Sequence, residues 1–182
     1  WGGVLLGLGV ISGVFGVAFA IGQHDLKRLL AYHSIENIGI IVAGIGLAIL
    51  FKAYGKSLLA AITLTAVLYH TLNHACFKSL LFLATGSVLH ATKERSLGTL
   101  GGLIHRMPWV AWLALVGTLA IAGIPPLNGF VSEWLLLQAF LFTPSLPQSF
   151  VNMLVPLAAG ALVLTAALTA YVMVKFYGVV FL

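Results

Sequence analysis

Charged residues are scarce in this sequence of 182 residues. They make up 7% of the chain, whereas 61% is hydrophobic, and Asp and Glu together number only 4. A soluble globular domain carries about a quarter charged residues, so composition excludes a water-soluble fold. The sequence therefore predicts an integral membrane protein, and its mean hydropathy of +1.11 agrees with that prediction.

Three further absences narrow the possibilities. The single cysteine, Cys76, permits no internal disulfide, and its place within an apolar run predicts a buried, unreactive thiol. No segment alternates apolar and polar residues with the period of two that a membrane β-barrel requires. The 9 Lys and Arg residues are scattered among apolar runs and form no patch with interleaved aromatic side chains, so nucleic acid is not an expected partner.

What the sequence does contain is a series of long apolar runs. A helix needs about 20 predominantly apolar residues to cross the roughly 30 Å hydrocarbon core of a bilayer. Five runs meet this requirement, at residues 3–22, 29–51, 57–90, 107–142 and 150–182. Within the fourth run, Pro125-Pro126 removes two backbone donors and Gly129 relaxes the chain, so one continuous helix is not possible there. We predict an all-α, polytopic transmembrane bundle of five spans whose fourth helix is broken near mid-membrane.

The loops between these runs carry unequal numbers of basic residues on the two sides of the membrane. Because successive loops alternate sides, five basic residues fall on one side and only Lys52 and Lys56 on the other. The richer side holds Lys27, Arg28, Lys93, Arg95 and Arg106. The positive-inside rule makes that side cytoplasmic. We expect a multi-pass protein embedded in the lipid bilayer of the cell inner (plasma) membrane, and, since the chain opens on Trp1, a fragment of a longer polytopic protein.

Three ionisable residues interrupt the third run in a regular pattern. His70, His74 and Lys78 follow one another at intervals of four residues, which places them on one helix face with about 6 Å of rise between neighbours. A His-x3-His pair can bind a metal, and a row of titratable groups can pass protons through bridging waters. Lys78 favours proton transfer, because an ammonium group repels a bound cation and no carboxylate or thiolate on that face would complete a ligand set. Haem is disfavoured as well, since two histidines one turn apart cannot bind both faces of one iron. We therefore expect no metal and no cofactor.

Two acidic residues also fall at membrane depth, where ionisable side chains generally have a function. Glu36 lies about 12 Å of helix rise inward from Arg28, and both a packing role and a proton-carrying role are open for it. Glu133 falls within the first two turns after the predicted break, where the helix dipole and the loss of hydration favour opposite charge states. Such a carboxyl group is suited to taking up and releasing a proton, the alternative being a hydrogen-bonded Glu beside a proline kink.

Three segments together resemble a known family. "HDLKRLLAYHSIENIGII", "YHTLNHACFKSLLFLATGSVLHAT" and "AGIPPLNGFVSEWLLLQAF" are similar, in the same order, to signatures of the antiporter-like membrane subunits shared by respiratory complex I, Mrp cation/proton antiporters and membrane-bound hydrogenases. The resemblance covers about residues 23–140. In that family two five-helix units are related by inverted symmetry and the fourth helix of each is broken, so residues 1–182 resemble the C-terminal-side unit alone. "YHSIENIGI" and "GIPPLNGFVSEW" look most like the large membrane subunit of hydrogenase-4 and formate hydrogenlyase-type complexes.

The resemblance implies which residues carry protons. His70, His74 and Lys78 match the family's His/His/Lys stripe, and Glu133 matches the charged residue of the broken helix. With Glu36 they form the expected proton path, although the buried Glu and Lys that the family's other unit supplies lie outside this sequence.

The implied function is that of a non-catalytic subunit of an oxidoreductase complex. It would translocate protons within a membrane-bound hydrogenase and couple that movement to electron transfer in partner subunits, with nickel-iron hydrogenase and iron-sulfur subunits as the expected partners. Two alternatives remain open. One is a complex I or Mrp-type subunit, in which the same residues would serve quinone-linked pumping or sodium/proton exchange; the other is a passive membrane anchor.

Overall fold

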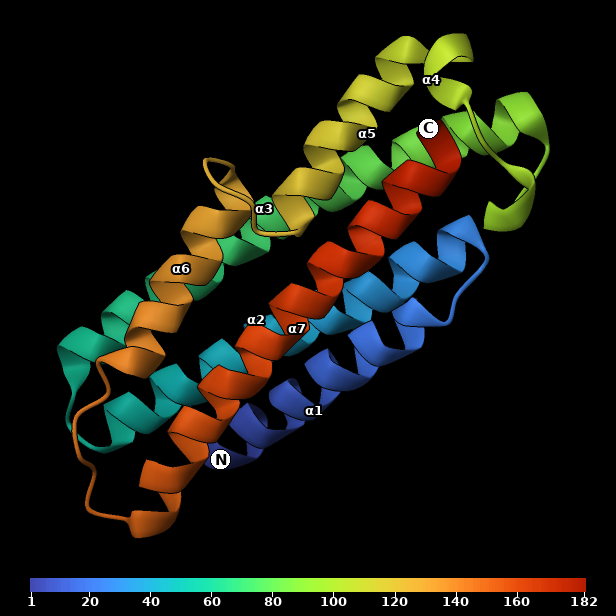
Figure 1. Ribbon diagram of the computed structural model, residues 1–182. Coiled ribbons are helices and arrows are strands. Elements are labelled where there is room, and N and C mark those ends of the chain that lie inside the picture. Colours follow the sequence, from blue (N-terminus) through green and yellow to red (C-terminus); the bar gives the residue numbers. More distant parts are fainter.

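The computed structural model describes residues 1–182 as a bundle of helices joined by short loops, with no β-strand beyond one isolated bridge (Figure 1). Four helices are individually long and apolar enough to cross a membrane: α1 (Gly2–Ile21), α2 (Leu26–Ala53), α3 (Ser57–Thr92) and α7 (Ser149–Phe181). Between α3 and α7 lie η1 (Leu97–Thr99), α4 (Leu103–Arg106), α5 (Pro108–Ile121) and α6 (Asn128–Leu141). The predicted all-α polytopic bundle is confirmed.

The fourth predicted span is the pair α5 and α6, and it is broken where the sequence indicated. Each of the two helices has 14 residues, which gives a length of about 21 Å, too short to cross a hydrocarbon core of roughly 30 Å alone. Both pack against α3, one after the other along its length (Figure 1). Residues 122–127 separate them and contain Pro125-Pro126 and Gly123, whose φ of +63° is one that residues with a side chain rarely adopt. A total of five spans, with α5 and α6 counted as one, remains a prediction.

Successive loops lie at opposite ends of the elongated bundle, as the alternation of basic residues requires (Figure 1). The α1–α2 loop and the segment after α3 meet at one end, where Leu97 N donates to His24 O and Leu26 N donates to Arg95 O. Asp25 begins α2 by accepting hydrogen bonds from the backbone N–H groups of residues 27 and 28, and its carboxylate lies 3.6 Å from Arg95 Nε. These contacts join the two loops that were assigned to the cytoplasmic side.

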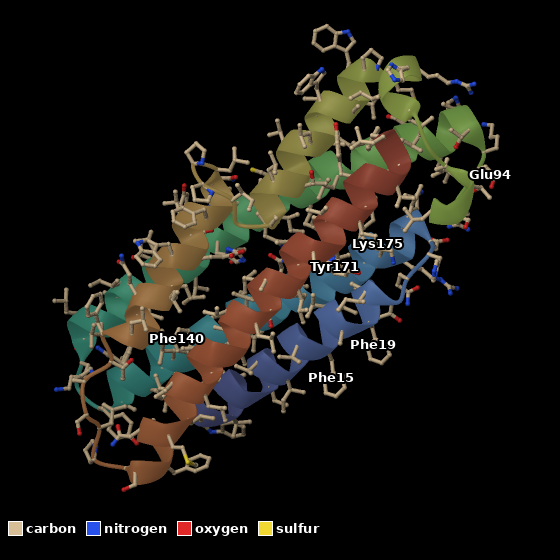
Figure 2. All side chains as sticks on the ribbon, viewed as in Figure 1. Phe15, Phe19, Glu94, Phe140, Tyr171 and Lys175 are labelled. Atoms are coloured by element: carbon tan, nitrogen blue, oxygen red, sulfur yellow. The ribbon has the colours of Figure 1, made fainter.

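This arrangement makes a testable prediction about sidedness. In a full-length subunit without other accessible cysteines, and carrying Cys76→Ser, a cysteine introduced by Glu94→Cys should react with a membrane-impermeant maleimide only from the cytoplasm. One introduced by Lys56→Cys should react only from outside. Both native side chains are exposed and flank α3 at its opposite ends, which makes them matched reporters. Figure 2 labels Glu94. Labelling of both positions from the same side would contradict the predicted topology.

The buried side chains divide into two hydrophobic clusters with a polar layer between them. One cluster gathers the parts of the helices nearest the α1–α2 loop, and the other gathers the opposite parts. Between them, at the level of the α5–α6 break, lie nine polar side chains that are each at most 5% exposed. We call these the mid-bundle polar layer: His33, Glu36, Asn37, His70, Asn73, Lys78, Ser132, Thr165 and Thr169.

One expectation about burial was wrong. Cys76 is exposed on the surface of α3 rather than buried. Apolar neighbours do not distinguish a core-facing position from a lipid-facing one, because in a membrane protein both are apolar.

Candidate functional site

The row of ionisable residues on α3 is placed as its spacing predicted. His70 is fully buried, Lys78 is 5% exposed and His74 is half-buried, so the row faces the interior of the bundle. His70 Nδ1 lies 2.9 Å from Ser132 Oγ on α6, and the His74 ring packs edge-on against Phe77. The Nε2 atoms of both histidines are buried without a hydrogen-bond partner in the protein. Such atoms are positions at which an internal water can bind.

Lys78 connects α3 to α2. Its ammonium group donates to the backbone carbonyl of Leu30 and lies 5.2 Å from the centre of the Phe82 ring. The Arg95–Asp25 ion pair and the His33–Glu36 contact do not involve it. A buried ammonium held by a carbonyl and an aromatic face can exchange its proton more readily than one locked against a carboxylate, because no opposite charge has to be separated.

Glu36 has a hydrogen-bond partner on each carboxyl oxygen. His33 Nδ1 lies 2.5 Å from Oε2, and Thr169 Oγ1 on α7 lies 2.5 Å from Oε1. Asn37 Nδ2 donates to His33 O at 2.9 Å, which links a third side chain to this group. Helix α1 approaches the same position so closely that a Cβ atom added to Gly16 would lie 2.6 Å from Glu36 N. Glu36 is therefore enclosed by α1, α2 and α7.

Glu133 lies in the second turn of α6 and lines a cavity of about 220 Å³ between α2, α6 and α7. The carboxyl group faces the helix break, since a Cβ added to Gly123 would lie 2.7 Å from Glu133 Oε2. No side chain or backbone group of the protein hydrogen-bonds to it, and the remaining lining of the cavity is mostly apolar. Glu36, Lys78 and Glu133, which the sequence predicted, thus lie on three different helices, α2, α3 and α6.

The start of α6 is fastened to α3 beside this group. Asn73 Nδ2 donates to Asn128 O at 2.9 Å, and Asn128 Nδ2 donates to Asn73 Oδ1 at 3.1 Å. These two bonds fix the first residue of α6 against α3, directly after the break. They also hold Ser132 against His70.

Sequence reasoning missed two partners of Glu36. His33 stands three residues before Glu36, a spacing that puts the two on neighbouring positions of a helix, so this contact had a detectable signal. Thr169 lies 133 residues away in an otherwise apolar helix and had none. No cluster of three or more His, Cys, Asp or Glu side chains in the structure is arranged to hold a metal ion.

Fold and site together define a class of protein: a helical membrane subunit with buried ionisable residues gathered beside a broken helix. The family described as NADH:quinone oxidoreductase/Mrp antiporter, TM, matches residues 1–155. The chain belongs to this family of antiporter-like membrane subunits, and the resemblance inferred from its motifs is confirmed.

Individual relatives agree with this assignment. Formate hydrogenlyase subunit 3 of Escherichia coli (strain K12) is 46% identical over all of this chain, and hydrogenase-4 component B of the same organism is 39% identical. The chain spans about 30% and 27% of the lengths of these two proteins. One Na(+)/H(+) antiporter subunit of Bacillus subtilis (strain 168) is 35% identical over 73% of this chain and is covered over 17% of its own length.

Solved structures show the same fold in larger assemblies. A chain of the Mrp complex from Dietzia sp. DQ12-45-1b superposes with a TM-score of 0.84 at 30% identity, covering 100% of this chain and 30% of that one. A chain of an archaeal membrane-bound sulfane sulfur reductase gives a TM-score of 0.81 at 30% identity, with 98% of this chain and 26% of that one covered. These relatives are subunits of multi-subunit membrane complexes, and the family places the present chain in the cell membrane.

Proposed function

We propose that this chain is one five-helix unit of a proton-translocating subunit in a membrane-bound hydrogenase of the hydrogenase-4 or formate hydrogenlyase type. Protons would pass between five ionisable side chains inside the bundle: Glu133, Glu36, Lys78, His74 and His70. The subunit itself would carry out no redox chemistry and would couple proton movement to electron transfer in partner subunits.

One observation carries the proposal: these five ionisable side chains, from α2, α3 and α6, and His33 beside them face the bundle interior at the level of the helix break. An ionisable group at mid-membrane costs about 2.5–3.5 kcal/mol on insertion scales, so several such groups together require a function or extensive mutual compensation. Direct compensation is incomplete, because Glu133 and the Nε2 atoms of His70 and His74 have no partner within the protein. These positions suit waters that relay protons between the side chains.

The geometry supports an order of transfer. Glu133 lines the cavity beside the break together with Ile40 of α2, and Lys78 donates to a carbonyl of α2, the helix that carries Glu36. Lys78 is one helical turn from His74, and His74 is one turn from His70. A proton reaching any of these groups changes the field at its neighbours, which is the coupling that a pump needs. Moving one charge against 100 mV costs about 2.3 kcal/mol, so the partner subunits must alter proton affinities in the layer by at least that amount.

The hydrogenase branch is supported by the relatives. Identity to formate hydrogenlyase subunit 3 is 46% over the whole chain, compared with 35% to the Bacillus subtilis antiporter subunit over 73% of it. On this basis we propose hydrogenase and iron-sulfur subunits as partners. A complex I or Mrp-type subunit is the second candidate, favoured by the Mrp complex structure that matches the whole chain.

Glu36→Gln tests the proposal at the residue that joins α2 to the rest of the path. Glutamine keeps the size and can hydrogen-bond, but it cannot bind and release a proton. We expect proton translocation in vesicles, driven by electron transfer through the intact complex, to fall about a hundredfold, as for loss of a positioned proton-transfer group. Glu94→Gln is the matched control, because Glu94 is an exposed loop residue at the end of the bundle (Figure 2).

Complex assembly and hydrogen-linked electron transfer should be measured in the same membranes. A Glu36→Gln complex that assembles and translocates protons at the parental rate would remove Glu36 from the path. Replacing sodium with potassium in the vesicles separates the proposed proton pump from an Mrp-type subunit, since a sodium/proton exchanger would slow and a proton pump would not.

A further inference from the structure

Thr169 has two possible acceptors for its single hydroxyl proton. Its Oγ1 lies 2.5 Å from Glu36 Oε1 and 2.9 Å from the backbone carbonyl of Thr165, one turn earlier in α7. The side chain is 1% exposed, so no bulk water competes for either contact. A hydroxyl group can donate one hydrogen bond at a time and accept others, and rotation about the C–O bond redirects the donated one.

The Thr169 hydroxyl can donate its hydrogen bond in two directions, and each direction matches one protonation state of Glu36. When Glu36 is ionised, Thr169 donates to Oε1. When Oε1 carries a proton, that carboxylic O–H donates to Thr169 Oγ1, and the threonine turns its own proton to the Thr165 carbonyl. In both states the carboxyl oxygen and the hydroxyl remain hydrogen-bonded. If the carboxyl oxygen or the hydroxyl lost its hydrogen bond in one of the two states, that state would be destabilised, because a buried polar group without a partner costs free energy.

We propose that Thr169 is a positioning residue whose reversible hydrogen bond lets the buried Glu36 carboxyl bind and release a proton in place. This inference rests on the proposed function, because it assigns a task to Glu36 as a proton carrier. It extends the site to α7, a helix from which neither the motifs nor the family resemblance supplied a residue.

No other side chain around Glu36 can hydrogen-bond to Oε1 in this way. On α2, His33 Nδ1 binds the other carboxyl oxygen, and a neutral imidazole nitrogen can donate or accept according to its tautomer. Helix α1 presents only the backbone at Gly16. Lys78 of α3 and Glu133 of α6 make no hydrogen bond to Glu36. Thr169 is thus the only hydrogen-bond partner of Oε1.

An ordinary role for a threonine within an apolar helix is a bond to the carbonyl four residues earlier. Thr165 does only this, donating to Ala161 O at 2.8 Å, and it is equally buried in the same helix. Thr165 therefore provides a matched control. Substituting it removes a buried hydroxyl from α7 without touching the Glu36 carboxyl.

The test compares Thr169→Ser and Thr169→Ala, which differ from each other only by the hydroxyl, in the full-length subunit within its complex. We expect Thr169→Ala to reduce proton translocation about tenfold, the effect of losing a hydrogen bond to a charged group, and Thr169→Ser to retain most of the parental rate. Thr165→Ala should translocate like the parent. Thr169→Val, which preserves the volume of the side chain, should be impaired like Thr169→Ala.

Infrared difference spectroscopy gives a readout that altered packing alone would not move. The carboxylic C=O band that is lost in Glu36→Gln should shift to higher wavenumber in Thr169→Ala and Thr169→Val, and should stay in place in Thr169→Ser and Thr165→Ala. Parental translocation in Thr169→Ala, or equal impairment in Thr169→Ser, would overturn the inference. Lys78→Ala in the same vesicles distinguishes a failure of the proposed function from a failure of this inference. If Lys78→Ala pumps normally, the proposed proton path is wrong. If Lys78→Ala does not pump but Thr169→Ala does, only the role of Thr169 is wrong.

Discussion

Lys78→Ala should abolish redox-driven proton translocation while the complex still assembles. Lys78 is the only lysine or arginine in the mid-bundle polar layer, and it joins α3 to α2 through the Leu30 carbonyl. Alanine removes both the titratable group and this contact. We expect a loss of at least about a hundredfold in the initial rate of proton uptake by vesicles, within the range for a missing proton-transfer group.

Lys78→Arg distinguishes a proton carrier from a fixed positive charge. A guanidinium group can keep the bond to the Leu30 carbonyl and the contact with the Phe82 ring, but it does not release its proton in proteins. We therefore expect Lys78→Arg to be almost as inactive as Lys78→Ala. If it pumps like the parent, Lys78 provides only a constant field, and proton transfer through it is excluded.

Lys175→Ala is a suitable control for both variants. Lys175 also donates from within a long helix to a backbone carbonyl, in this case Ile21 O at 3.1 Å, at the end of α1 (Figure 2). It lies outside the polar layer, so translocation should remain close to the parental rate. A similar loss in Lys175→Ala would show that removing any lysine that bonds to a neighbouring helix disturbs the bundle.

The sequence was sufficient to locate the helices and the break. Apolar runs with charged or glycine-containing ends give boundaries that agree with the structure within a few residues, because only a helix can satisfy its backbone in lipid. Pro125-Pro126 marks the interruption between α5 and α6 for the same physical reason. The inward orientation of His70 and Lys78 followed from their spacing and from the cost of placing them in lipid.

The sequence was not sufficient to find the contacts between helices. Thr169 meets Glu36 only because α7 crosses α2 at the level of the polar layer, and one threonine in an apolar helix looks the same whether it faces a carboxyl group or only its own backbone. The exposure of Cys76 was missed for a related reason, since lipid-facing and core-facing residues have the same apolar character. Pairings between distant helices depend on packing geometry, which the pattern within one helix does not contain.

Glu133→Gln is expected to have an effect as large as that of Lys78→Ala, but for a different reason. The Glu133 carboxyl is the only ionisable group in the cavity beside the break, and it has no hydrogen-bond partner in the protein, so it depends on water and on its own proton for compensation. Glutamine fills nearly the same volume beside Gly123 and cannot titrate. We expect proton uptake to fall at least about a hundredfold with normal assembly, because the path then has no acceptor at the cavity.

Glu133→Asp and Glu94→Gln complete this experiment. Aspartate still titrates but is one methylene shorter, so it should lie farther from its neighbours and retain a reduced rate, between those of the parent and Glu133→Gln. Glu94→Gln removes an acidic side chain from an exposed loop and should leave the rate unchanged. The order of the rates of proton uptake decides between two roles for Glu133. If the cavity requires a titratable group, Glu133→Asp is faster than Glu133→Gln. If the break requires only side-chain volume, Glu133→Gln is faster. If glutamine supports faster proton uptake than aspartate, Glu133 fills space at the break and does not carry protons.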